Sequence, residues 1–79
     1  MKVYFREQSG DRLIEAGKEI FVEEMKKPFL ITGEKDRLSI LGEHESIEKA
    51  RETLNEVIQR IVQPTAREVE KGIIFIDLG

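Results

Sequence analysis

The fold is decided by residues 29–61, FLITGEKDRLSILGEHESIEKARETLNEVIQRI. Two apolar runs, residues 29–32 and 37–41, lie on either side of the short polar link 33–36. A short, glycine-containing link between two runs rich in apolar residues is typical of a β-hairpin. We therefore predict two antiparallel strands here, and Gly42 closes the second of them.

The residues after Gly42 form the clearest helical pattern in the chain. Apolar side chains recur every three or four positions, as they do on one face of a helix. Ser46 is a natural N-cap, and Gln63 followed by Pro64 ends the pattern. We expect Ile58, in the middle of this stripe, to lie in the core. The stripe consists of Ile47, Ala50, Leu54, Val57, Ile58 and Ile61.

The two ends of the chain each predict a strand. Residues 2–7 are β-branched and aromatic in their middle and stop at the turn formers 8–11. Near the other end, Thr65 and Glu68 match a capping box, which predicts a short helical turn over 65–71. Residues 73–78 then alternate in two sets that are both mostly apolar, and such a strand is usually covered on both faces.

Residues 13–24 leave two interpretations open. Leu13, Ala16, Gly17, Ile20 and Phe21 match the spacing of an amphipathic helix, and we take a helix as the first interpretation. However, glycine costs a helix interior about 1 kcal/mol, and Ile20 and Val22 also alternate with glutamates as in a strand. The alternative is that Gly17 marks a break before an extra strand.

The resulting order, β-α-β-β-α-β, predicts an α+β fold of the ferredoxin-like split βαβ type, with one domain over residues 1–79. Its four-stranded antiparallel sheet would carry both helices on one face and have the first and third strands in the middle. We expect Val3, Phe5, Leu38 and Ile40 to face the helices. The outward positions would then hold Tyr4, Arg37, Ser39, Leu41 and one apolar set of the last strand.

Composition limits the range of functions. Of the 79 residues, 39% are hydrophobic and 37% are charged, which favours a globular chain. The absence of cysteine removes disulfides, thiolate metal sites and thiol catalysis. Thirteen Lys and Arg against sixteen Asp and Glu give a net charge of -3, which repels a phosphate backbone. Nucleic acid would therefore need a local basic patch.

Location and habitat are indicated only by general features. The sequence has neither a signal-peptide core nor an apolar stretch of the roughly 20 residues that a membrane span requires, so we expect a cytoplasmic protein without a membrane partner. A single asparagine, Asn55, no tryptophan and abundant Glu, Lys and Arg are typical of proteins made for heat.

Catalytic patterns are absent from the sequence. His44 lies between two glutamates but has no second histidine or cysteine with which to hold a metal, and we interpret it as a solvated residue near a helix start. Ser9 and Ser46 have no histidine at a suitable spacing and are better explained as caps. The isolated turn glycines form no phosphate-binding loop. We therefore expect no enzyme, no metal and no cofactor.

One local resemblance concerns RNA binding. Residues 38–42, LSILG, and 45–50, ESIEKA, with the helix that follows, are similar to the last strand and helix of KH-type RNA-binding domains. The GxxG loop that clamps RNA in that family is missing. Tyr4 and Phe5 resemble the base-stacking aromatics of sheet-surface readers, but the other middle strand, 37–41, has none. An RNA-binding module is thus the alternative hypothesis.

The leading hypothesis is a non-enzymatic module that works through protein association, as a homodimer or as a small subunit of a complex. The last strand motivates it, because large apolar groups in water on an edge strand favour aggregation and would be buried by a second copy. We expect Ile74 and Ile76 to point outward and Phe75 to fill the core. The residues predicted to contact the partner, through the open sheet face, are Tyr4, Leu41, Ile74, Ile76 and Leu78.

Overall fold

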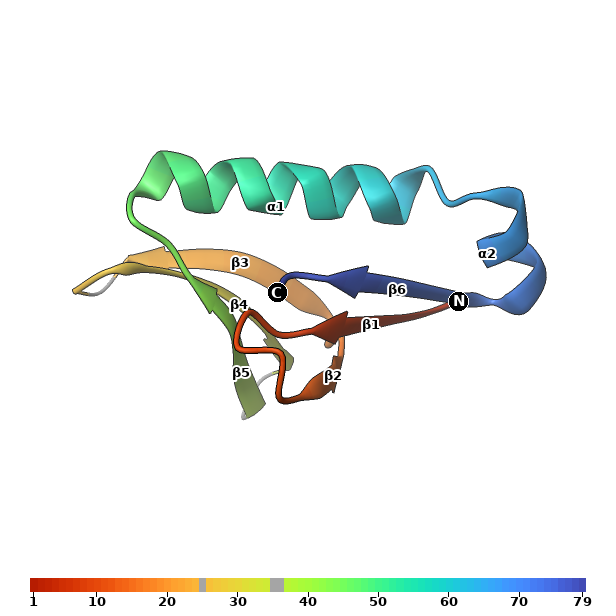
Figure 1. Ribbon diagram of the computed structural model, residues 1–79, viewed down its shortest axis with the longest axis horizontal. Coiled ribbons are helices and arrows are strands. Elements are labelled where there is room, and N and C mark those ends of the chain that lie inside the picture. The colour runs from red at the N-terminus through yellow and green to blue at the C-terminus, as the bar shows by residue number, and fades with distance from the viewer. Residues whose placement is uncertain (25, 35–36) are drawn as a thin grey trace.

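The computed structural model describes residues 1–24, 26–34 and 37–79 and shows an α+β protein with a long helix lying along two small sheets (Figure 1). The elements, in chain order, are β1 (Lys2–Arg6), β2 (Leu13–Glu15), β3 (Glu19–Glu24), β4 (Pro28–Glu34), β5 (Arg37–Glu43), α1 (Ile47–Val62), α2 (Ala66–Lys71) and β6 (Ile73–Asp77).

The strands form two three-stranded sheets, ordered β2-β1-β6 and β3-β4-β5. In the first sheet, β1 pairs antiparallel with β2 and parallel with β6, while both pairings in the second sheet are antiparallel. The prediction of one four-stranded, ferredoxin-like antiparallel sheet is therefore wrong. The parallel pair arises because α1 and α2 carry the chain from β5 back to the edge of the first sheet.

The prediction failed mainly at residues 13–24, which form β2 and β3 rather than a helix. Gly17 lies between these strands, where a Cβ atom would come within 2.6 Å of the backbone carbonyl of Gly33. The buried Thr32 hydroxyl accepts a hydrogen bond from Gly17 N at 2.9 Å and donates to Glu19 O at 3.0 Å. The alternative interpretation, a break at Gly17 before an extra strand, is confirmed.

The hairpin, the long helix and the capping box are confirmed. The side chain of Ser46 accepts from Lys49 N, and α1 ends at Val62 with Gln63 as its C-cap. At α2, Thr65 Oγ1 accepts from Glu68 N while a Glu68 carboxylate oxygen accepts from Thr65 N. The predicted hairpin link includes residues 35 and 36, which lie outside the described residues.

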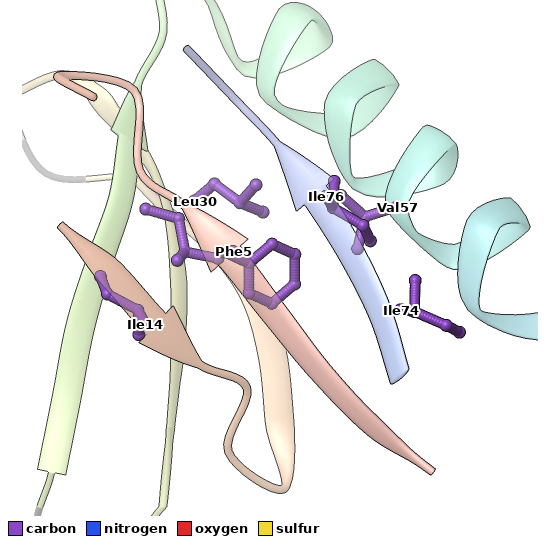
Figure 2. Packing of buried hydrophobic residues seen from close by; sticks show 7 residues of the cluster. Phe5, Ile14, Leu30, Val57, Ile74 and Ile76 are labelled. Carbon is purple, nitrogen blue, oxygen red and sulfur yellow. The ribbon is translucent and has the colours of Figure 1, made fainter. Parts of the chain in front are cut away.

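The core lies between the inner faces of the two sheets and the facing side of α1 (Figure 2). Ala50 and Val57 of α1 are fully buried, whereas Ile58 is 43% exposed, so the predicted core position of Ile58 is wrong. One residue along a helix is a rotation of about 100°, which is enough to turn Ile58 away from the sheets. The buried core cluster consists of Phe5, Ile14, Leu30, Leu41, Val57, Ile74 and Ile76.

The last strand presents the opposite face to the one predicted. Ile74 is fully buried and Ile76 nearly so, while Phe75 is half exposed. The register explains this, because Phe5 pairs with Ile76 and therefore shares its face with the core. The expectation that Ile74 and Ile76 point outward and that Phe75 fills the core is wrong.

The faces of β5 are likewise reversed. Leu41 is buried, whereas Leu38 and Ile40, which were expected under the helices, are exposed. The inner face of this sheet is set by Leu30 and Thr32 on β4, and a register shift between β4 and β5 leaves Leu41 as the extra, inward residue.

Candidate protein interface on the outer sheet faces

The outer face of the β3-β4-β5 sheet is a grid of three rows of three residues. The pairing register aligns one residue of each strand in every row. Because side chains alternate along a strand, these nine share the face opposite to the core. We call this grid the apolar face. Its rows are Glu19–Gly33–Leu38, Phe21–Ile31–Ile40 and Glu23–Phe29–Glu43.

The middle row of the apolar face has no polar side chain. Ile31 is buried but lies outside the core cluster, between Phe21 on one side and Ile40 on the other. Ile40 is 52% exposed, and Leu38 in the neighbouring row is 58% exposed. Large apolar side chains adjacent on a three-stranded surface form a contiguous patch, which on soluble proteins commonly marks an interaction site.

Acidic side chains occupy three of the four corners of the apolar face, and Leu38 occupies the fourth. Glu19 and Glu23 are exposed on β3, and Glu43 on β5 forms an ion pair with Lys27 at 3.0 Å. The hydrogen bond and the charge of Glu43 raise the pKa of Lys27 above its ordinary value. Among the nine grid positions, all within the described strands, none is lysine or arginine. The face is thus apolar in the middle and negative at its margin.

The outer face of the β2-β1-β6 sheet is built differently, and we call it the mixed face. Phe75 and Tyr4 lie side by side in one row, with Glu15 beyond them. In the next row, Arg6 Nη1 donates to a carboxylate oxygen of Asp77 at 3.2 Å. On this face, basic and acidic side chains lie between the apolar side chains. The face comprises Lys2, Tyr4, Arg6, Leu13, Glu15, Ile73, Phe75 and Asp77.

The edge of β6 is partly covered. Lys2 N donates to Gly72 O, and Leu78 N donates to Arg6 O. The backbone N–H and C=O groups of the even-numbered residues of β6 therefore point toward β1, and those of the odd-numbered residues point toward the free edge. There, Arg60 Nη2 donates to Phe75 O at 3.1 Å. A strand added to this edge would have to displace the guanidinium, which is one way in which proteins protect edge strands.

Arg60 is held in place by α2. Its guanidinium donates to both carboxylate oxygens of Glu68, each at 3.0 Å. These bonds, with one from Thr65 N, lower the pKa of Glu68 below its ordinary value. The same contact raises the pKa of Arg60. The pair links α1, α2 and β6.

The five residues predicted to contact a partner do not come together on one surface. Leu41, Ile74 and Ile76 belong to the core of the chain itself. Leu78 is partly buried against that core, and Tyr4 lies half buried on the mixed face. The apolar face was missed, although the alternation of Phe21, Ile31 and Ile40 with inward residues was visible in the sequence. To find this face from the sequence, residues 19–24 would have had to be predicted as a strand instead of a helix.

His44 lies at a separate cleft of about 300 Å³ between α1 and the end of β6. Its Nε2 atom is buried without a hydrogen-bond partner, and Gln8, Thr53, Glu56 and Asp77 line the same cleft. A buried imidazole nitrogen of this kind is a hydrogen-bonding position for a water molecule or a small polar group. Within the described ranges, the structure has no group of three His, Cys, Asp or Glu side chains that could hold a metal ion.

In the part of the chain that the structure describes, neither helix has the length and apolarity needed to cross a membrane. Comparison of the chain with protein-family models, with curated proteins and with solved structures gave no match.

Proposed function

We propose that this chain is a non-enzymatic module that works through protein association, and that the partner covers the apolar face. The carrying observation is the row Phe21–Ile31–Ile40, which joins a buried residue outside the core to an isoleucine that is 52% exposed. Burying half-exposed side chains of this size contributes about 1 kcal/mol or more each. The proposal thus keeps association through an open sheet face but assigns the contact to other residues than the sequence predicted.

We also propose that the protein is cytoplasmic, as expected from the sequence. The RNA-binding alternative is less well supported, because exposed glutamates at the margin of the apolar face repel phosphate groups. On the mixed face, Tyr4 and Phe75 do lie together, but the neighbouring basic Arg6 is paired with Asp77.

Light scattering of the isolated chain over a concentration series tests the proposal. An apolar face without its partner should cause weak attraction between molecules, and about 0.3 M salt should strengthen it by screening the glutamates. Ile40→Thr should reduce this attraction, whereas the matched variant Ile73→Thr, from the mixed face, should reduce it much less. Both isoleucines are about half exposed on strands.

The proposal fails if wild type and Ile40→Thr scatter identically at every concentration, or if Ile73→Thr has the larger effect. A salt-sensitive shift with single-stranded oligonucleotides, lost in Tyr4→Ala and kept in Ile40→Thr, would favour the RNA-binding alternative instead.

A further inference from the structure

The size of the apolar face limits what can cover it. Its three strands span about 10 Å across, and residues 19–23 span about 13 Å along β3. These dimensions give a footprint on the order of 130 Å², whereas each partner of a stable complex buries about 800 Å². The apolar face on its own thus matches a single peptide segment better than the broad interface of a stable dimer of two stacked copies.

Charge also disfavours a second copy. Each copy would bring the exposed Glu19 and Glu23 and a net charge of -3 to the same interface. Like charges placed opposite one another across an interface weaken it. A partner that carries lysine or arginine around an apolar stripe would instead meet these glutamates favourably.

An amphipathic helix has the matching dimensions. Its diameter with side chains is about 10–12 Å, and anchors at i, i+3 or i+4, and i+7 span about 10 Å. The inner face of the same sheet is already covered in this way, since α1 packs against β3 and β4 (Figure 1).

From the size, the apolar middle row and the acidic corners, we infer that the apolar face receives an amphipathic helix of a partner protein whose apolar stripe is flanked by lysine or arginine. The inference rests on the proposed function and adds the chemistry of the partner. Ile31, Ile40 and Phe21 form the floor on which the stripe lies. Glu19 and Glu23 lie where the basic flank passes.

Two synthetic peptides provide the test. The first is an amphipathic helix of about 18 residues made of leucine and lysine, and the second has glutamate in place of every lysine. Binding is followed by NMR amide shifts of the full chain. The basic peptide should shift residues of the apolar face and bind at least about tenfold more tightly than the acidic peptide.

Matched variants locate the binding. Ile40→Thr should weaken the basic peptide about tenfold, and Ile73→Thr should leave it unchanged. Glu23→Lys should weaken the basic peptide several-fold, whereas Glu15→Lys, from the mixed face, should have less effect. Both glutamates are exposed on edge strands, so folding should survive in each variant.

The inference and the proposed function can fail separately. Equal binding of the two peptides, or shifts that gather on the mixed face, would overturn the inference. If neither peptide binds while Ile40→Thr still lowers the attraction between molecules, the helix is refuted and association through the apolar face stands. If neither peptide binds and Ile40→Thr changes nothing, both are refuted.

Discussion

The two sheets have the same number of strands, but their outer faces differ in how charged side chains are placed around the exposed apolar ones. On the mixed face, Arg6 and Asp77 form an ion pair beside the exposed Phe75. On the apolar face, Ile31 and Ile40 are adjacent with no charge between them. Interspersed charges of both signs suit a solvated surface. A continuous apolar row bordered by acids suits a surface that is covered by a partner.

The largest effect should separate the inner from the outer side of β6. Ile74→Ala should lower the free energy of unfolding by about 2–5 kcal/mol, because Ile74 is fully buried in the core. Ile73→Ala, next to it on the mixed face, should cost less than about 1 kcal/mol. Urea unfolding of both variants measures the difference. Equal losses would mean that the mixed face is not an outer face.

A smaller loss should follow from breaking the junction between the two sheets. Thr32→Val leaves Gly17 N and Glu19 O without their shared hydroxyl in a part-buried position, which should cost about 1–2 kcal/mol. Thr53→Val is the control, because the Thr53 hydroxyl donates only within α1, to Lys49 O. If both variants unfold at the same urea concentration, Thr32 does not hold the bend at Gly17.

The smallest effect concerns the Arg60–Glu68 ion pair at the edge of β6. Glu68 has a pKa lowered by Arg60, so its charged form is favoured in the folded state. This contribution to stability is present at neutral pH, which lies above the pKa of Glu68 in the unfolded chain. It is lost as the pH falls through the lower pKa of Glu68 in the folded protein. Arg60→Gln should therefore raise the titration midpoint of the Glu68 carboxyl carbon in NMR. An unchanged midpoint would show that the pair does not form in solution.

Local patterns carried most of the fold that the sequence could predict. The hairpin, the capped helix over Ile47–Val62 and the capping box at Thr65 depend on neighbouring residues alone. The structure of residues 13–24 does not depend on neighbouring residues alone, because the close approach of Gly17 to Gly33 is a tertiary contact. With a helix placed there, both β2 and β3 were missing from the prediction, and the two-sheet topology with them.

The candidate site failed for a related reason. Both alternating sets of β6 are apolar, so the sequence alone does not indicate which one faces inward. The register with Phe5 decides it. In the same way, Leu41 is inward only because of the irregular pairing around Leu30 and Ile31. Once Ile74, Ile76 and Leu41 belong to the core, the surface that lacks a cover is that of Phe21 and Ile40.

The most direct test of the central claim is a map of NMR amide shifts of the unmodified chain as its concentration rises in about 0.3 M salt, where the glutamates are screened. Attraction through the apolar face should move the signals around Phe21, Ile31 and Ile40 and leave those around Tyr4 and Phe75 in place. Shifts that gather around Tyr4 and Phe75, or no shift on either face, would contradict the account.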